Sequence, residues 1–435
     1  MHEPRSSLTR VHRVWTAAAL VQWALVVGVG VWLAVWWQPE PHSDWLHYWY
    51  AAGEPDRYER GGASLWLLAI PKALGWSPVA SALALNLPAA SLLGFLAYRV
   101  DPTRWRWLAQ MVVAYLLLIT PFFGIVQLDL IAAAQLALGL WFALDPRIGV
   151  RRTTRLALAT MAVAFAVSTK PQYALVLWAL LGMAVVTCLF ARFRAGFLVR
   201  GVYGVLLAGT LLGFAADMAM RKTSGRMEAV RTSSAVTLYG GLLVSGDSRE
   251  QGCGYWSVEA ASAARADLGK PMAIAIRDRL LARPLGHWMS VVECKLPQIV
   301  SPPPYALYWL VESPNIRERI DASPDRERID ARYDQAIAWE SRVYRVLTAL
   351  ILLACFWTSV RLWRNGSQLA GLPVLWILAF WGVHTIFEIQ GRYFLGMFVV
   401  APLLCAALLR QRPDAQQGEG VQPAGAAPDR GQAAA

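Results

Sequence analysis

Charged residues are scarce in this sequence of 435 residues. Asp, Glu, Lys and Arg make up 16% of the chain, whereas hydrophobic residues make up 56%. The five cysteines and six histidines show no spacing typical of a zinc site. This much apolar surface exceeds what the core of one soluble domain can bury. The sequence therefore excludes an ordinary soluble domain and predicts an all-α polytopic membrane protein.

Long apolar runs recur along the chain and predict about ten transmembrane helices. The expected spans are 14–37, 79–98, 107–123, 125–144, 155–169, 173–191, 197–219, 343–361, 369–388 and 393–409. The runs that meet at Pro121 and at Pro171 are near the short limit for a span, so broken or shallow helices are the alternative there. The first run ends in Trp and Gln rather than at a small-residue cleavage site, which favours an uncleaved span over a signal peptide.

Arginine placement predicts the orientation of these spans. Alternation from a cytoplasmic N-terminus places every Arg-rich connection on the cytoplasmic side, together with the C-terminus. Those connections are 99–106, 145–155, 192–200, 361–364 and the tail from 410, whereas the opposite turns at 120–128, 169–172 and 388–392 carry few cations. The net charge of +12 is explained by this pattern, and no nucleic-acid partner is expected.

The same alternation divides the chain into segments. Residues 1–13 form the cytoplasmic N-terminus, and residues 14–219 form an N-terminal transmembrane module with a first outer loop at 38–78. Residues 220–342 are expected to form a mostly helical extracytoplasmic segment, in which Cys253 and Cys294 either pair or remain free thiols. C-terminal transmembrane helices then occupy 343–409, and 410–435 is predicted to be a disordered cytoplasmic tail.

The first outer loop contains a carboxylate among aromatic residues. Asp44 is followed by Trp45 and Tyr48 just beyond the first span. A carboxylate there could deprotonate a sugar hydroxyl while aromatic faces hold the sugar ring. The alternative is an interfacial aromatic belt with a helix cap at Ser43 or Asp44.

Two cations stand in outward turns that the charge rule would leave neutral, Lys170 and Arg392. Lys170 could meet a lipid phosphate, or could reach ordinary headgroups by snorkelling. Arg392 could bind phosphate with two N–H groups, or could pair with Glu388 four residues earlier. Lys295 is a weaker phosphate candidate, with a surface lysine as the alternative.

Gln127 and Asp129 open another span on the outer side. Asp129 could orient a substrate or bind a cation. Capping of the helix N-terminus is the alternative, because a carboxylate there also favours the helix dipole.

Four motifs, in order along the chain, resemble the GT-C superfamily of membrane glycosyltransferases, and most closely the polyprenyl-phosphate-sugar-dependent enzymes of glycosyltransferase family 87. The motifs are Asp44 followed by Tyr48 and Ala51-Ala52, Gln127-Leu128-Asp129, Lys170-Pro171-Gln172, and Gln390-Gly391-Arg392-Tyr393-Phe394. The resemblance extends from about residue 14 to 410.

The resemblance implies a transferase that moves a mannose- or arabinose-like sugar from a polyprenyl-phosphate donor to a lipid or cell-envelope glycan acceptor at the outer face of a bacterial plasma membrane. Asp44 would be the general base, and Lys170 and Arg392 would hold the donor phosphate. The implied substrate-binding set also contains Gln172, Tyr393, Gln127, Asp129, Tyr48 and Trp45. No acidic residue adjoins Asp44, so no metal ligand is assigned, although a divalent cation remains an alternative.

Two other functional classes fit a protein of this composition. A lipid or glycan transporter or flippase would be expected to carry ionisable residues at midspan and repeated halves, which this sequence lacks. A non-catalytic envelope-assembly protein would keep the phosphate-binding cations without turnover.

Overall fold

The computed structural model describes residues 5–54, 56, 61–126, 128–145, 148–190, 201–224, 227–242, 254–281 and 283–410. Within these residues every regular element is a helix. The N-terminal half contains α1 Arg5–Trp37, α2 Ser43–Ala51, α3 Gly62–Ala73, α4 Pro78–Tyr98, α5 Arg106–Leu118, η2 Thr120–Phe122, α6 Asp129–Leu144, α7 Arg152–Thr169, α8 Gln172–Phe190 and α9 Gly201–Ser224. The remainder contains α10 Met227–Leu242, α11 Val258–Ala266, α12 Met272–Ile276, η5 Arg277–Leu281, α13 Leu285–Val300, α14 Ala306–Val311, α15 Pro314–Asp321, α16 Arg326–Arg364, α17 Leu372–Ile386, η6 Gly391–Phe394 and α18 Leu395–Leu409.

Six of the described helices are long and apolar enough to cross a membrane. They are Val11–Trp37, Pro78–Tyr98, Gln172–Leu189, Gly201–Met220, Arg326–Arg364 and Gly391–Leu409. The other expected spans correspond to the shorter apolar helices α5, α6 and α17 and to the 18-residue α7. The predicted class of helical membrane protein is therefore confirmed, whereas the count of ten spans stays a prediction.

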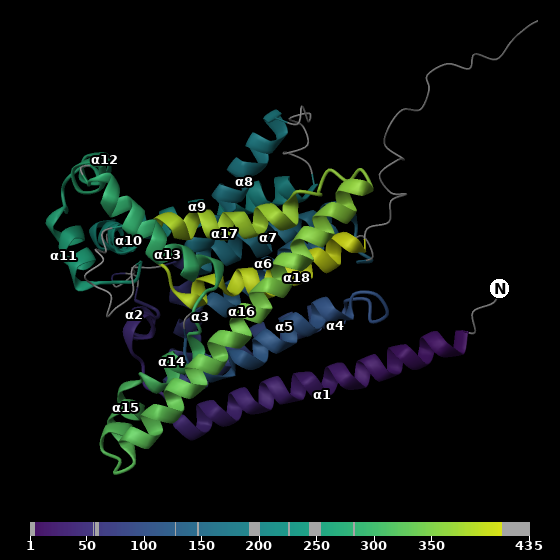
Figure 1. The fold of residues 1–435 in the computed structure, drawn as a ribbon, viewed down its shortest axis with the longest axis horizontal. Helices are drawn as coiled ribbons and strands as arrows, with labels where there is room; N and C mark the ends of the chain where they lie inside the picture. Colours follow the sequence, from purple (N-terminus) through teal and green to yellow (C-terminus); the bar gives the residue numbers. More distant parts are fainter. Residues whose placement is uncertain are drawn as a thin grey trace, which may run out of the picture.

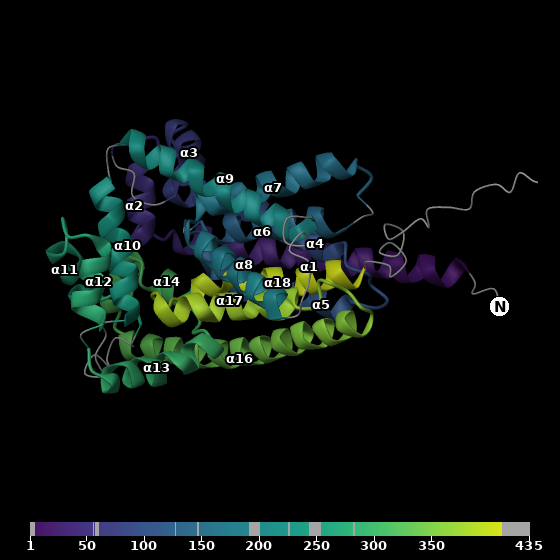
Figure 2. The ribbon, with the colours of Figure 1, turned by 90° about the horizontal axis from the view of Figure 1, so that it is seen from above.

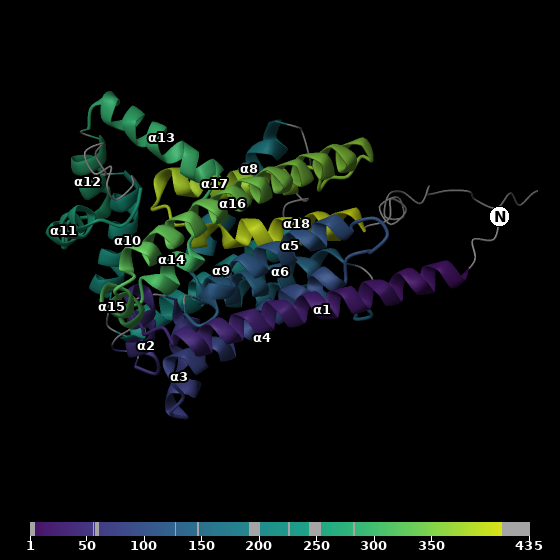
Figure 3. The same ribbon diagram turned by 60° about the horizontal axis from the view of Figure 1, so that its bottom comes forward.

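The long helices form a bundle, and the short helices collect at one end of it (Figure 1). Helices α2, α10, α11, α12 and α15 lie at the end of the bundle farthest from the N-terminus in all three ribbon views (Figures 2 and 3). We call this the insertion end. Helix α18 runs through the middle, in contact with α4, α5, α6, α16 and α17, and its side chains are almost all buried.

Contacts at the other end join the connections that were predicted to be cytoplasmic. Arg410 donates to the Arg99 carbonyl at 2.5 Å and pairs with Asp145 at 3.5 Å. Arg155 donates to the Asp145 carbonyl at 2.8 Å. The connections at 99–106 and 145–155 and the start of the tail at Arg410 therefore meet at one end of the bundle, as the predicted alternation requires. Which end faces the cytoplasm stays a prediction.

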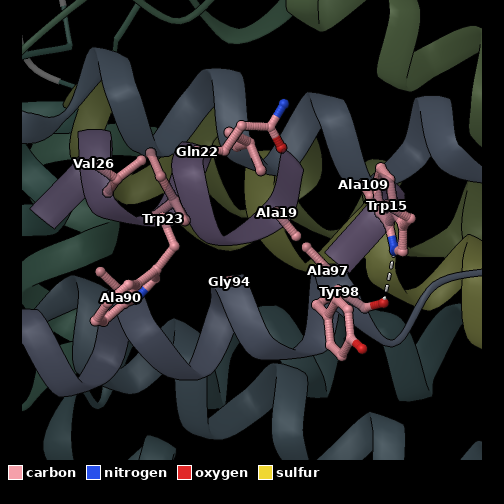
Figure 4. A pocket seen from close by; sticks show the side chains of 12 residues that line it. Trp15, Ala19, Gln22, Trp23, Val26, Ala90, Gly94, Ala97, Tyr98 and Ala109 are labelled. Atoms are coloured by element: carbon pink, nitrogen blue, oxygen red, sulfur yellow. Dashed lines mark hydrogen bonds between the residues drawn. The ribbon is translucent and has the colours of Figure 1, made fainter. Parts of the chain in front are cut away.

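Helix α1 lies at the edge of the bundle and is only partly packed against it. A narrow pocket separates it from α4 and α5, with Trp15, Gln22 and Trp23 on one wall (Figure 4). Trp15 donates its indole N–H to the Tyr98 carbonyl at 3.2 Å, and Gln22 exchanges amide hydrogen bonds with Gln110. These polar contacts hold α1 in position along the bundle. Apolar packing alone would not do so, because lipid competes for the apolar face of α1.

The expected boundary at residues 342 and 343 falls inside α16, which is continuous over 39 residues. The last helix of the segment 220–342 and the next expected span are thus one continuous helix. Cys294 is disulfide-bonded, whereas Cys188, Cys355 and Cys405 are free. Cys253 and the predicted tail from residue 411 lie outside the described residues.

Two glycines of α9 allow it to pack closely against α7. On α9, a Cβ at Gly209 would lie 2.6 Å from the Val163 side chain of α7, and one at Gly213 would lie 2.6 Å from the Ala164 carbonyl. Small residues four positions apart let the backbones of two membrane helices approach closely.

We expect Gly209→Val to force α7 and α9 apart and to destabilise the protein by about 1–3 kcal/mol, the usual cost of overpacking. The measurement is the thermal unfolding midpoint in detergent. Gly182→Val in α8 is the matched control, because a Cβ there meets nothing within 4 Å. Equal midpoints for the two variants would refute the packing argument.

A buried carboxylate joins several side chains of the segment 220–342. Asp267 accepts hydrogen bonds from Lys270 and Tyr239, both at 2.9 Å, and two from Arg279. The Arg279 hydrogen bonds, aided by Lys270 and Tyr239, lower the pKa of Asp267 to about 2.

This lowered pKa predicts an acid-sensitive segment. The stabilisation is present above the ordinary pKa of the carboxyl and is lost as the pH falls through about 2. We expect Asp267→Asn to lower the thermal midpoint at pH 7 but to have a shrinking effect below pH 4, measured across a pH series. The exposed Asp334→Asn is the control. An Asp267→Asn deficit that does not change with pH would contradict this account.

Candidate functional site

Arg392 and Asp44 form an ion pair inside the insertion end. The guanidinium Nη2 donates to Asp44 Oδ2, which joins η6 to α2 across 348 residues of chain. Arg392 is 1% exposed and Asp44 is 9% exposed. Arg392 is connected to Glu388, the predicted alternative partner, through Gln390: Arg392 Nε donates to Gln390 Oε1 at 2.6 Å, and Gln390 in turn donates to Glu388.

Lys170 and Asp129 form a second buried pair. Lys170 Nζ lies 3.2 Å from Asp129 Oδ2 and donates to the Tyr48 hydroxyl at 3.4 Å. Lys170 follows α7 and Asp129 begins α6, so the pair ties together the ends of two neighbouring helices. At 7% exposed, Lys170 does not snorkel to headgroups, and that alternative is wrong.

The two pairs belong to one cluster. The ring of Tyr393 is 5.7 Å from Lys170 Nζ and 5.2 Å from the Arg392 guanidinium carbon, so it lies between the two cations. Asp129 also interacts electrostatically with Arg392 and Asp44. Two carboxylates and two cations thus share a buried space, and their formal charges cancel.

Aromatic residues complete the walls. Trp309 of α14 lies 4.9 Å from the Arg392 guanidinium and 5.2 Å from the His42 ring. Trp45 is fully buried against His42, and Tyr48 packs beside Lys170. Burial lowers the pKa of His42, and the nearby Arg392 charge adds to this, so the imidazole is neutral at pH 7. Sequence reasoning missed Trp309, although Tyr305, Tyr308 and Trp309 form a visible aromatic run.

Gln172 is connected to the charged residues through His384 and Tyr393. Its amide nitrogen lies 3.3 Å from His384 Nε2, and His384 stacks on Tyr393 with ring centroids 5.7 Å apart. The predicted site residue Gln127 lies outside the described residues.

Neither carboxylate is a helix cap. The residues at the cap positions of α2 and α6 are His42 and Leu128, and neither makes a side-chain capping bond. Asp44 and Asp129 therefore do not cap their helices, but both lie in the first turn, where a carboxylate favours the helix dipole, as predicted for Asp129. Ser43 and Leu128, each directly before one of these carboxylates, have positive φ angles of 50° and 60°. Such backbone costs about 1–3 kcal/mol in a residue other than glycine and tends to occur at functional sites.

Lys295 holds the chain segment that carries Arg392. Its Nζ donates to the carbonyls of Gly241 at 2.9 Å, Thr385 at 2.9 Å and Phe387 at 3.0 Å. It is 1% exposed, so the surface-lysine alternative is wrong, and it contacts no site cation or carboxylate through these bonds. Burial lowers the pKa of Lys295 to about 7, and Glu388 opposes this shift.

Backbone contacts fix the rest of that segment. Glu388 N–H donates to the Thr237 carbonyl at 2.9 Å, and Ile389 N–H donates to the Gly254 carbonyl at 2.6 Å. Gly391 passes so close to the Pro303 carbonyl that a Cβ would lie 1.9 Å from that oxygen. Only glycine fits there, which explains its place before Arg392.

The residues of the site do not fit a metal centre. Asp44 and Asp129 each contact a cationic side chain, and no group of three or more His, Cys, Asp or Glu in the described part of the chain could hold a metal ion. We derive no step through a metal.

The fold and composition define a helical membrane protein with a buried, charge-balanced polar site at one end of its bundle. No protein-family model, curated protein or solved structure matches the chain.

We expect Lys295→Met to loosen the segment 388–394, because three carbonyls lose their donor and the buried one, that of Gly241, is left unsatisfied at about 1–3 kcal/mol. The measurements are the unfolding midpoint and the protection of residues 388–394 in hydrogen exchange. The exposed Lys222→Met is the matched control. Unchanged protection in Lys295→Met would show that Lys295 does not position Arg392.

Proposed function

We propose that the protein is a membrane glycosyltransferase that transfers a mannose- or arabinose-like sugar from a polyprenyl-phosphate donor to a lipid or envelope-glycan acceptor. The proposal places the reaction at the outer face of a bacterial plasma membrane, with the insertion end outside. The observation that carries it is the convergence of Asp44, Asp129, Lys170 and Arg392, from four separate parts of the chain, in one buried cluster.

The cations suit a phosphate. Arginine can bind phosphate with two parallel N–H groups, and lysine acts as a point charge toward it. Both lie where a bundle of apolar helices ends, so a donor could keep its lipid tail in hydrocarbon while its phosphate reaches Lys170 and Arg392. Such preorganised charges stabilise the anion that leaves when the sugar–phosphate bond breaks.

The carboxylate suits the acceptor. Asp44 would take the proton of the acceptor hydroxyl as that oxygen bonds to the anomeric carbon of the sugar. The bond from this carbon to the phosphate oxygen breaks, and its electron pair leaves with polyprenyl phosphate. Trp309 and Trp45 supply aromatic surfaces of the kind that pack against sugar rings.

We expect Asp44→Asn to reduce sugar transfer by about 10²–10⁴-fold, the usual contribution of a general base. The assay reconstitutes the protein in vesicles with mannosyl or arabinosyl polyprenyl phosphate and an envelope-lipid extract as acceptor. Lys170→Met should instead weaken binding of polyprenyl phosphate, measured by quenching of tryptophan fluorescence.

Asp145→Asn is the matched control, because Asp145 is also buried and also pairs with an arginine, Arg410, but at the opposite end of the bundle. It should cost comparable stability and leave transfer intact. Undiminished transfer in Asp44→Asn would remove Asp44 as the base. Transport of the lipid across the vesicle membrane without sugar transfer would favour a flippase instead.

A further inference from the structure

Glu340 is a buried carboxylate outside the charged cluster. It lies on α16, is 5% exposed, and neither of its carboxylate oxygens has a hydrogen-bond partner among the described residues. The hydroxyl of Tyr344, one helical turn later, is also buried, and it interacts with Tyr115. Residues four positions apart share a helix face, so both polar groups point to the same side of α16.

That side of α16 faces a group of aromatic rings. The ring centroids of Tyr344 and Tyr115 are 5.7 Å apart, and Phe398 of α18 packs against both rings at 5.3 Å and 4.6 Å. The Tyr115 hydroxyl lies 3.2 Å from that of Tyr305, which precedes α14. Tyr344, on the same face of α16 as Glu340, is therefore surrounded by aromatic rings.

No described cation compensates Glu340. The basic residues nearest in sequence, Arg342 and Arg345, are both exposed. The titratable groups that interact electrostatically with Glu340 include three tyrosines, Tyr115, Tyr333 and Tyr344. An ionised carboxylate in such surroundings is too costly to persist, so it neutralises by binding a positive charge.

Tyr115 connects this carboxylate to the charged cluster. It interacts electrostatically with Glu340 and also with Asp129, the partner of Lys170. The two carboxylates therefore act on the same buried tyrosine, where little water screens their charges.

We propose that Glu340 is a proton-binding site, in which the carboxyl group holds an exchangeable proton at neutral pH beside the Tyr344 hydroxyl. The proton is the ligand that requires least space and leaves a carboxyl able to donate a hydrogen bond. Loss of this proton adds a negative charge beside Tyr115, which also interacts with Asp129. An anion bound at Lys170 is then less favoured, so the site couples pH to phosphate affinity.

The proton itself is tested without any assumption about activity. The probe is the infrared band of a protonated carboxyl, recorded on the full chain in lipid nanodiscs. We expect the wild-type protein to show this band at pH 7 and Glu340→Gln to lack it. Glu327→Gln, an exposed residue of the same helix, should leave the band unchanged.

Three outcomes would overturn the proposal. The first is the absence of a protonated-carboxyl band from the wild-type protein at pH 7, and the second is its persistence in Glu340→Gln. The third is a carboxylate band that moves when Na⁺ is exchanged for Cs⁺ or Mg²⁺, which would assign a metal cation to Glu340. Glu340→Gln has nearly the shape of the protonated form, so we expect it to fold.

The coupling to phosphate affinity rests on the proposed function and has a separate test. Binding of polyprenyl phosphate is measured by fluorescence quenching from pH 6 to 9 for wild type and Glu340→Gln. The lipid phosphate titrates in the same way in the wild-type and Glu340→Gln measurements. Comparing the two proteins therefore removes the contribution of the lipid to the pH profile. We expect at least a threefold greater loss of affinity with rising pH in the wild type. Parallel pH profiles would refute the coupling, whereas absence of binding to both proteins would refute the proposed function and leave the infrared result standing.

Discussion

Arg392 is buried in a bundle of apolar helices, where a guanidinium is tolerated only beside a carboxylate. Asp44 meets this requirement from the other end of the chain, and the contact fixes α2 against η6. Removing one partner of such a pair typically costs about 3–5 kcal/mol, because the other charge is left uncompensated. Replacing both partners with apolar residues is often neutral, so stability alone does not explain why the pair is present.

The surrounding structure positions the pair in detail. Lys295 fixes the end of α17, Gly391 brings the backbone against Pro303, and Trp309 covers the guanidinium. Strained backbone at Ser43 and Leu128 orients the two carboxylates. These features come from segments that are far apart in sequence, and each adds a cost or a constraint without enlarging the apolar core. A site that must hold several charges in one geometry explains their coincidence better than packing does.

The sequence is sufficient for the helical class and for the separation of the two ends. Long apolar runs predict the helical class, and the alternation of Arg-rich connections predicts the separation of the two ends. Both signals depend on composition over many residues. The sequence also singles out Asp44, Asp129, Lys170 and Arg392 as candidates, because an ionisable residue at the edge of a span is unusual. Composition cannot supply their partners, since Asp44 and Arg392 are 348 residues apart.

Single-residue burial is where sequence reasoning fails. Lys295 looks like a surface lysine in a polar segment, yet α10 and α17 enclose it. Glu340 looks like one of many charges on a long helix, and only the aromatic residues of α5 and α18 reveal its isolation. Continuity of α16 through residues 342 and 343 is likewise invisible, because the polar and apolar halves of one helix read as two segments.

The formal charges of Asp44, Asp129, Lys170 and Arg392 cancel, which affects how an anion could enter the cluster. A phosphate brings negative charge to a neutral site, so it binds Lys170 or Arg392 well only if a carboxylate withdraws from that cation. Withdrawal from Arg392 would change the chemistry of Asp44. A carboxylate held by a guanidinium accepts a proton less readily than one released from it. Donor binding and activation of the base would then be the same event. A site built in this way keeps its base inactive until the phosphate is in place, which limits reaction with water in the absence of donor.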